Sequence, residues 1–293
     1  MNIKAYLKSM RLRTLPLSLA GIIAGIALAS DVASLEIPVV VMLILTTIGL
    51  QVLSNTSNEL GDTLSGTDTA DRQGIRYALQ DGDITVDQMK KFIGGIVVFC
   101  CISGAAMTWL SFKTLFGVAP LCILALGVAA IWAAMCYTLG KNPYGYRAKG
   151  DYSVFIFFGL ATVLGAAYIC SHQFRLMWLL PAAAIGCWSV AVLNVNNIRD
   201  MKTDAATRQT IAIKLGLKNA RIYQTILITL GWALMIAHTV LDSADGFAWY
   251  RLLTFPLFVI HLVGVWKHTE KELDPLLPLL VLSTFATAIL LLF

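Results

Sequence analysis

The sequence predicts an all-α, polytopic membrane protein with nine transmembrane helices. Of its 293 residues, 58% are hydrophobic and only 13% are charged, whereas soluble domains carry about 25% charged residues. The mean hydropathy is +0.75, and several apolar runs reach the roughly 20 residues that cross the hydrocarbon core of a bilayer. Lysine and arginine also gather in alternate connections between these runs. Together these observations exclude a soluble domain.

The first apolar run follows Arg11 and Arg13 and has no small-residue cleavage site after it, so we expect a retained helix rather than a signal peptide. The remaining runs are separated by alternating short and longer polar connections. The predicted spans are Leu15–Ala29, Ile37–Asn55, Phe92–Phe112, Leu115–Leu139, Val154–Ser171, Leu176–Asn194, Ala220–Leu241, Tyr250–Lys267 and Pro275–Phe293.

The basic residues set the predicted topology. Of 22 lysines and arginines, all but Lys113, Arg175 and Arg251 lie in the N-terminal flank or in the even-numbered connections. By the positive-inside rule, the N-terminus and the longer loops are cytoplasmic, and the count of spans is odd. We therefore expect an integral membrane protein with cytoplasmic loops that cap the bundle.

Two polar motifs each follow an apolar run at this cytoplasmic side. They are NTSNELGDTLSGTD (Asn55–Asp68) and NVNNIRDMKTD (Asn194–Asp204). If helical, each motif places three oxygen-bearing side chains on one face, at i, i+3 and i+7. The two sets are Asn55, Asn58 and Asp62, and, 142 residues later, Asn197, Asp200 and Asp204. Four spans separate the motifs, which predicts two parallel four-helix halves and an appended ninth helix.

Two loops have predicted structure of their own. The connection Thr63–Lys91 is too polar for lipid and is expected to form short helices over the cytoplasmic mouth. The connection after the second motif is predicted to be helical from Asp204 to Leu215, with Gly216 as a helix stop.

The motifs favour a hard cation and a phosphorylated ligand. Carboxylate and amide oxygens suit Mg²⁺, which binds through a few carboxylates plus substrate phosphates, and neither motif contains the His or Cys that softer metals prefer. One such motif is explained by a helix end that faces water, but two with matched spacing are not. Basic residues beside them could neutralise the remaining phosphate charge: Arg72, Arg76, Lys141, Arg147, Arg199, Lys202 and Arg208. A lipid diphosphate fits a charged mouth above apolar helices.

The chain resembles the UbiA superfamily of intramembrane aromatic prenyltransferases, and within it the menaquinone-pathway branch that prenylates 1,4-dihydroxy-2-naphthoate. The matching passages are RTLPLSLAGIIAG (Arg13–Gly25), Gln51 with NTSNELGDTLSGTDTADR (Asn55–Arg72), YTLGKNPYGYRAKGDYSVFIFFG (Tyr137–Gly159), and NNIRDMKTD (Asn196–Asp204) with TIAIKLG (Thr210–Gly216). They are spread over most of the chain, which implies one transmembrane prenyltransferase domain over residues 1–293. The resemblance also implies a location in a prokaryotic plasma (inner) membrane.

The resemblance implies a Mg²⁺ site and a diphosphate site on the two motifs. The implied metal ligands are Asn58, Glu59, Asp62, Asp200 and Asp204, of which Asn58, Asp62, Asp200 and Asp204 are also the catalytic candidates. The substrate-binding candidates are Arg13, Gln51, Asn55, Arg72, Arg76, Tyr137, Lys141, Tyr146, Arg147, Asn197 and Arg208. Two departures stand out: Glu59 replaces the usual aspartate, and Ala-Thr-Arg after Asp204 is one residue shorter than the usual Gly-Lys-containing run.

The implied reaction transfers a polyprenyl group from an allylic polyprenyl diphosphate to 1,4-dihydroxy-2-naphthoate. Carbon dioxide and diphosphate leave, and the product is a demethylmenaquinone. Arg13 is a candidate for the acceptor's carboxylate, and Asp151 and Asp68 are candidate bases. Aromatic faces stabilise a cation-like allylic carbon, and the candidates near the mouth are Tyr137, Tyr146, Tyr152 and Phe155.

Three alternatives remain open at this point. The first is a prenyltransferase of the same type with another aromatic acceptor, because every metal residue is shared. The second is a cation-coupled membrane transporter, which the internal duplication favours, although the carboxylates lie at one surface instead of the midplane. The third, a structural membrane protein, leaves the paired motifs unexplained. No nucleic-acid partner is expected.

Overall fold

The computed structural model describes residues 3–66, 76–242 and 248–293, and within these ranges the chain is helical and contains no strand. The α-helices are α1 (Ile3–Met10), α2 (Leu15–Ser30), α3 (Ile37–Leu64), α4 (Val86–Phe112), α5 (Val118–Cys136), α6 (Gly150–Val154), α7 (Thr162–Ser171), α8 (Leu179–Arg199), α9 (Met201–Asp204), α10 (Ile211–Leu241), α11 (Phe255–Lys267) and α12 (Leu276–Leu290). The other helical segments are η1 (Leu12–Thr14), η2 (Tyr144–Tyr146), η3 (Phe155–Ala161), η4 (Leu176–Trp178), η5 (Trp249–Leu252) and η6 (Glu270–Leu273).

Nine helical stretches in the described ranges are long and apolar enough to cross a membrane, as the hydropathy pattern predicts. They are Ile3–Ser30, Ile37–Leu64, Val86–Phe112, Val118–Cys136, Gly150–Ser171, Leu176–Arg199, Ile211–Leu241, Trp249–Lys267 and Glu270–Leu290. Several extend beyond the predicted apolar runs, because the polar motifs and basic flanks continue the same helices. In α3, for example, the helix runs through the whole stretch from Asn55 to Asp62.

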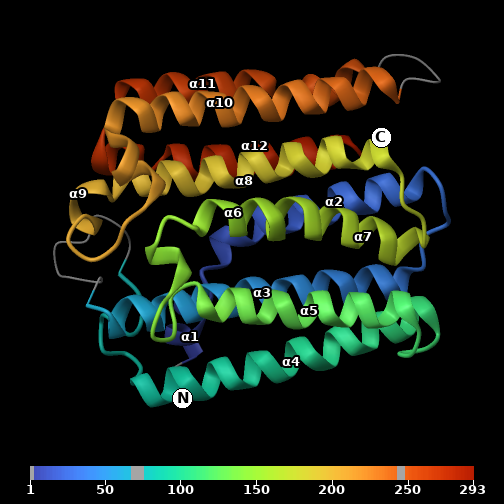
Figure 1. Ribbon diagram of the computed structural model, residues 1–293, viewed down its shortest axis with the longest axis horizontal. Coiled ribbons are helices and arrows are strands. Elements are labelled where there is room, and N and C mark those ends of the chain that lie inside the picture. The colour runs from blue at the N-terminus through green and yellow to red at the C-terminus, as the bar shows by residue number, and fades with distance from the viewer. Residues whose placement is uncertain (1–2, 67–75, 243–247) are drawn as a thin grey trace.

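The long helices lie side by side along the long axis of the molecule (Figure 1). Consecutive spans alternate in direction, so α3 and α8 end at the same end of the bundle, which we call the polar end. Eighteen described basic residues lie at or near it: Lys4, Lys8, Arg11, Arg13, Arg76, Lys90, Lys91, Lys141, Arg147, Lys149, Arg199, Lys202, Arg208, Lys214, Lys218, Arg221, Lys267 and Lys271. The two motifs therefore meet at one basic surface.

The seam between the two halves is a close contact between α2 and α7, the first and fifth spans. A Cβ atom on Gly25 would lie 2.4 Å from the Val163 carbonyl oxygen and 2.6 Å from the Ala166 Cβ, so only glycine allows this approach. The ninth span, α12, packs on α2, α8 and α11. Spans one and five are equivalent under the four-span offset, so their pairing is consistent with two parallel halves plus one helix.

The helix that carries the second motif, α8, is fixed by packing and by buried hydrogen bonds. The Trp188 ring lies 4.7 Å from that of Phe258 on α11, measured between centroids. At the first residue of the motif, Asn194 Nδ2 donates to Gln224 Oε1 of α10 at 2.8 Å, and the Gln224 amide contacts His261 Nε2 of α11 at 2.9 Å. Because buried polar groups are costly without partners, this chain of bonds favours one rotation of α8.

Two backbone irregularities shape the polar end. Arg11 has a left-handed backbone (φ 51°), which turns α1 away from α2. The predicted helix from Asp204 to Leu215 is wrong over its middle: α9 ends at Asp204, and Gln209 instead forms an isolated parallel bridge with Arg147. The predicted stop at Gly216 is confirmed as a break within α10, where φ is 72°.

Candidate active site

A cavity of about 500 Å³ opens between α2, α3, α4, α5, the η3–α7 segment and α8. At the polar end its wall holds Asn58, Asp62, Asn197 and Arg208, and at its deep end it holds apolar residues such as Leu43. Leu43 and Asp62 are 19 residues apart on one helix, or ~28 Å at 1.5 Å per residue. The cavity therefore joins a charged mouth to an apolar channel nearly as long as the hydrocarbon core is thick.

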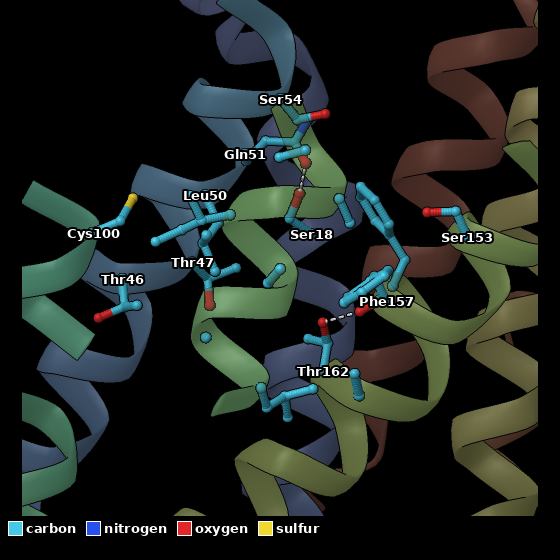
Figure 2. Close-up of a pocket in the computed structure, with 18 of the residues that line it drawn as sticks. Ser18, Thr46, Thr47, Leu50, Gln51, Ser54, Cys100, Ser153, Phe157 and Thr162 are labelled. Atoms are coloured by element: carbon cyan, nitrogen blue, oxygen red, sulfur yellow. Dashed lines mark hydrogen bonds between the residues drawn. The ribbon is translucent and has the colours of Figure 1, made fainter. Parts of the chain in front are cut away.

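The α3 wall presents successive turns of polar side chains, as the helical spacing predicts. Gln51, Asn55, Asn58 and Asp62 all line the cavity. Gln51 accepts a hydrogen bond from Ser18 of α2, and Figure 2 shows these two side chains pointing toward each other. Gln51 Nε2 also donates to Asn55 Oδ1 at 3.1 Å. This network ties α3 to α2 and fixes which face of α3 the motif presents.

Asp62 is buried at the mouth and is contacted from two other segments. The Tyr146 hydroxyl donates to Asp62 Oδ1 at 2.7 Å, and Arg208 Nη1 lies 3.8 Å from the same oxygen. One turn earlier, Asn58 Oδ1 accepts from the Thr138 hydroxyl at 3.3 Å. Three segments therefore bring predicted site residues together. Helix α3 carries Asn58 and Asp62, η2 carries Tyr146, and the loop after α9 carries Arg208.

The carboxylates of the second motif are already paired with arginines. Asn197 lines the cavity, but Asp200 is 1% exposed, lies behind the wall and is held by Arg199, whose Nη2 is 2.6 Å from Asp200 Oδ2. Asp204 is also buried and lies 2.7 Å from Arg208 Nη2. Arg208 therefore stands between a carboxylate of each motif.

Burial and charge act in opposite directions on this pair. Burial raises the pKa of the Asp204 carboxyl, and the nearby Arg208 opposes that rise. For Arg208, burial lowers the pKa, but the Asp204 and Asp62 carboxylates outweigh it and raise the pKa above the usual value. The guanidinium is therefore a permanent cation at the mouth. Its place is set by backbone bonds from Gln209 N to Tyr146 O (3.0 Å) and from Ala148 N to Gln209 O (2.8 Å).

The donor set fits Mg²⁺ with substrate oxygens completing the shell. Asn58 and Asp62 offer amide and carboxylate oxygens to the cavity, and Asp204 adds a buried carboxylate whose partner is Arg208. Among the described residues, no three His, Cys, Asp or Glu side chains gather closely enough to hold a metal by themselves. Mg²⁺ commonly binds in this way, through one or two carboxylates plus phosphate oxygens.

The structure does not bring Glu59 to the cavity. Glu59 is fully buried, and its Oε1 accepts from the Leu79 backbone N–H at 2.8 Å while Oε2 has no hydrogen-bond partner. The reason is helical periodicity, since Glu59 lies about 100° around α3 from Asn58. In this arrangement Glu59 binds the loop between α3 and α4 through Leu79 and does not face the mouth of the cavity.

Four predicted substrate-binding cations also lie away from the cavity wall. Arg13 is exposed and donates to the Tyr77 hydroxyl at 2.9 Å. Arg76 is exposed and pairs with Asp81 at 2.9 Å. Lys141 and Arg147 are exposed on the loop after α5, where Arg147 donates to Asn142. Each side chain is drawn toward water or a surface partner. Arg72, and the candidate base Asp68, lie outside the described residues.

Sequence reasoning missed Arg11, which lines the cavity in place of Arg13. The Arg11 guanidinium stacks 3.8 Å above the Tyr77 ring, and its buried Nε and Nη2 have no hydrogen-bond partner. The left-handed backbone at Arg11 turns this side chain inward. The sequence does place two arginines, Arg11 and Arg13, just before the first span, but it does not show which of the two side chains faces the cavity.

The aromatic wall also differs from the prediction. Tyr137 lines the cavity as expected, but Tyr152 is 70% exposed and Phe155 does not reach the cavity. Phe157 and Phe158 line it instead, because η3 is a π-helical segment that changes the register of span five. Figure 2 shows Phe157 and Thr162 on the side of the pocket opposite Thr46 and Cys100. π-helical turns are frequent at functional sites.

Asp151, the candidate base within the described residues, is not at the cavity either. Asp151 is buried outside the cavity wall and accepts a hydrogen bond from the Tyr223 hydroxyl at 3.1 Å. It therefore has a structural partner between α6 and α10.

Comparison with known proteins gives a consistent family. A model of the UbiA prenyltransferase family matches residues 18–285. A 1,4-dihydroxy-2-naphthoate octaprenyltransferase of Escherichia coli (strain K12) is 38% identical over 93% of this chain and 87% of its own length. A protein of the same name from Haemophilus influenzae is 35% identical over 94% of this chain and 90% of its own length.

Solved structures share the fold at low sequence identity. The apo structure of a UbiA homolog from Aeropyrum pernix K1 superposes with a TM-score of 0.72 at 17% identity and covers 96% of both chains. A UbiA homolog from Archaeoglobus fulgidus, solved bound to DMAPP and Mg²⁺, has a TM-score of 0.69 at 12% identity and covers 98% of this chain and 99% of its own. These likenesses support the all-helical, nine-span architecture.

Proposed function

The chain belongs to the UbiA prenyltransferase family, and from that premise we propose that it transfers a polyprenyl group from an allylic diphosphate to 1,4-dihydroxy-2-naphthoate. The near full-length relatives named for that reaction support the acceptor. One observation in the structure favours the donor: a single cavity joins the oxygen-rich mouth to an apolar channel along the helices. The family also favours an enzyme over the transporter that the sequence alone left open.

The mouth is suited to the diphosphate end of the donor. Mg²⁺ bound there would neutralise the diphosphate and stabilise it as the leaving group. Arg208 is held by Asp62 and Asp204 and adds a fixed cation at the same place, so it stabilises the charge that develops on the departing oxygen. Asn58 and Asp62 would hold the metal from α3, and the second motif would complete the site through Asp204 and Asp200.

The cavity wall is suited to the allylic carbon. The C–O bond to diphosphate breaks with its electron pair on the oxygen, which leaves a cation-like carbon that must be kept from water. The rings of Tyr137, Tyr144, Phe157 and Phe158 line the wall, and aromatic faces attract such a cation. The apolar residues deeper along α3, α4 and α5 would hold the tail.

Arg11 is the cation in the cavity wall available for the acceptor's carboxylate, because its Nε and Nη2 are buried without a hydrogen-bond partner. The ring carbon that bears the carboxylate attacks the allylic carbon and forms a C–C bond. The bond to the carboxylate then breaks, its electrons return to the ring, and CO₂ leaves, so the immediate product is the reduced form, a demethylmenaquinol. A separate two-electron oxidation, outside this reaction, turns it into demethylmenaquinone. The positive-inside bias supports a cytoplasmic mouth in a plasma membrane.

The direct test is an assay with purified protein in lipid nanodiscs. Octaprenyl diphosphate, carboxyl-labelled dihydroxynaphthoate and Mg²⁺ are expected to give demethylmenaquinol, labelled CO₂ and diphosphate in equal amounts. Omitting Mg²⁺ is expected to abolish all three. If folded protein turns over 4-hydroxybenzoate but not the naphthoate, the acceptor assignment is wrong. If it releases no diphosphate with either acceptor, the proposed function is wrong.

A further inference from the structure

Arg199 connects the second motif to the segment that precedes the ninth span. Its Nε and Nη2 donate to the two oxygens of Asp200 at 2.8 and 2.6 Å, and Nη2 also donates to Asn196 Oδ1 at 2.9 Å. On its other side, Nη1 donates to Asp274 Oδ1 at 2.9 Å. Asp274 lies between η6 and α12. One buried guanidinium is therefore shared by two carboxylates.

The charges of this triad do not cancel. Asp200 and the Arg199 side chain are 1% and 5% exposed, whereas the Asp274 side chain is 39% exposed and faces water. Two carboxylates and one guanidinium carry a net charge of about −1. If Asp200 were the only carboxylate partner of Arg199, the two side chains would form a neutral buried pair, since a bidentate arginine–carboxylate contact satisfies both partners. Asp274 therefore decides whether Asp200 contributes negative charge at the mouth.

We propose that Asp274 is a positioning residue that shares Arg199 with Asp200 and so keeps Asp200 able to attract the divalent cation and its diphosphate. This inference rests on the proposed function, because it assigns that cation to the polar end. It gives the ninth span a role in the site, although none of the residues lining the cavity comes from α10, α11 or α12. The effect is electrostatic and requires no contact between Asp274 and substrate.

A second ion pair joins the same two segments and provides a matched control. Lys202 of α9 pairs with Glu270 of η6. The Lys202 side chain is 82% exposed, and no described hydrogen bond or ion pair joins this pair to Asp200 or Arg199. Glu270→Gln therefore removes one charge and one cross-link from this interface, as Asp274→Asn does, without releasing Arg199.

The test measures Mn²⁺ binding to detergent-solubilised protein with inorganic pyrophosphate, from the loss of the free-ion EPR signal. Asp274→Asn is expected to raise the dissociation constant of Mn²⁺ about tenfold, since the lost charge acts across a partly buried site. Glu270→Gln is expected to change it less than about twofold, as for exposed pairs. Asp274→Glu keeps the charge and is expected to retain wild-type affinity.

Thermal unfolding without metal shows that the variants are folded, and Asp274→Ser replaces Asp274→Asn if the latter does not fold. Wild-type affinity in the neutral variant, or an equal loss in Glu270→Gln, overturns the inference. So does an equal loss in Asp274→Glu, because the charge is then irrelevant. A wild type that binds Mn²⁺ and pyrophosphate but prenylates no acceptor contradicts the proposed function instead, and leaves the charge-sharing result standing.

Discussion

The two motif helices end at the same mouth with matched spacing but in different electrostatic settings. On α3, Asp62 faces the cavity and is held by the Tyr146 hydroxyl, with Arg208 at 3.8 Å. In the second motif, Arg199 donates hydrogen bonds to both carboxylate oxygens of Asp200, which does not line the cavity. Asp204 lies 2.7 Å from Arg208. The first motif is open to a ligand, whereas the second is partly neutralised by arginines of its own segment.

This difference shows that a repeated spacing does not repeat an environment. The halves share the four-span offset and the helical faces of the motifs, but the second motif contains Arg199 and is followed by Arg208, whereas the corresponding positions of the first motif are Ser57 and Gly66. The first motif is therefore expected to be the main source of metal ligands. The second is expected to contribute ligands together with the cations that balance the diphosphate.

The largest expected effect comes from the open motif. Asp62→Asn removes a carboxylate that faces the cavity and is expected to lower kcat by roughly 100- to 1,000-fold, the usual cost of losing one transition-state-stabilising group. Glu59→Gln changes a neighbouring acid that does not line the cavity, and it is expected to keep kcat within about tenfold. Steady-state prenyl-transfer kinetics check both. Equal losses in the two variants would show that facing the cavity does not separate them.

The next effect concerns the cation between the motifs. Arg208→Gln leaves Asp62 and Asp204 without their shared partner and is expected to lower kcat/KM for the prenyl diphosphate by roughly 30- to 1,000-fold, because truncating a buried charge pair costs at least about 2 kcal/mol. The exposed Arg147→Gln is the control, with an expected change below about threefold. A strong effect of Arg147→Gln with a weak effect of Arg208→Gln would contradict the assignment.

A smaller effect separates the two arginines before the first span. Arg11→Gln is expected to raise KM for the naphthoate at least about tenfold, since one charge-assisted hydrogen bond is worth about 1.5–3 kcal/mol, while KM for the prenyl diphosphate stays near that of the wild type. Arg13→Gln is expected to leave both constants close to wild type. If Arg13→Gln instead raises the KM of the naphthoate alone, then Arg13 is the acceptor's partner.

The smallest effect on prenyl transfer is expected for substitutions at the α2–α7 contact between the halves. These are expected to change the stability of the fold instead. Gly25→Ala forces a Cβ against Val163 and Ala166 and is expected to cost about 1–3 kcal/mol of stability. Gly95→Ala on α4 has nothing within 4 Å of the added atom and is expected to be neutral or to stabilise by up to ~1 kcal/mol. Thermal unfolding in one detergent compares them, and equal midpoints would contradict the close α2–α7 contact.

Much of this architecture can be predicted from the sequence, because it depends on the lengths of the apolar runs and on the helical repeat. Hydropathy gives the nine spans, and alternating direction places both motifs at the end where the basic residues gather. Helical spacing of 3.6 residues puts Asn55, Asn58 and Asp62 on one face, and all three line the cavity. These features need only the length of an apolar run and the pitch of a helix.

The remaining features depend on backbone irregularities and on neighbouring segments. The left-handed turn at Arg11 decides which arginine faces inward, and the π-helical η3 replaces Phe155 with Phe157 and Phe158 on the wall. Helical periodicity turns Glu59 away from the cavity, but its partner there, the backbone N–H of Leu79, lies in the loop between α3 and α4. The Arg199 guanidinium donates hydrogen bonds to Asp200 on one side and to Asp274, 75 residues later in the chain, on the other. No local pattern contains these partners.

The most direct test of the central claim is a structure with Mn²⁺ and a non-hydrolysable thiolodiphosphate analogue of the donor. We expect an anomalous Mn²⁺ peak bound by Asp62 and Asn58, with the diphosphate oxygens facing Arg208 and at least one carboxylate of the second motif completing the site. The analogue's tail is predicted to follow the cavity along α3 toward Leu43. A diphosphate bound away from both motifs, or held by one motif alone, would contradict the claim that the two halves form one site.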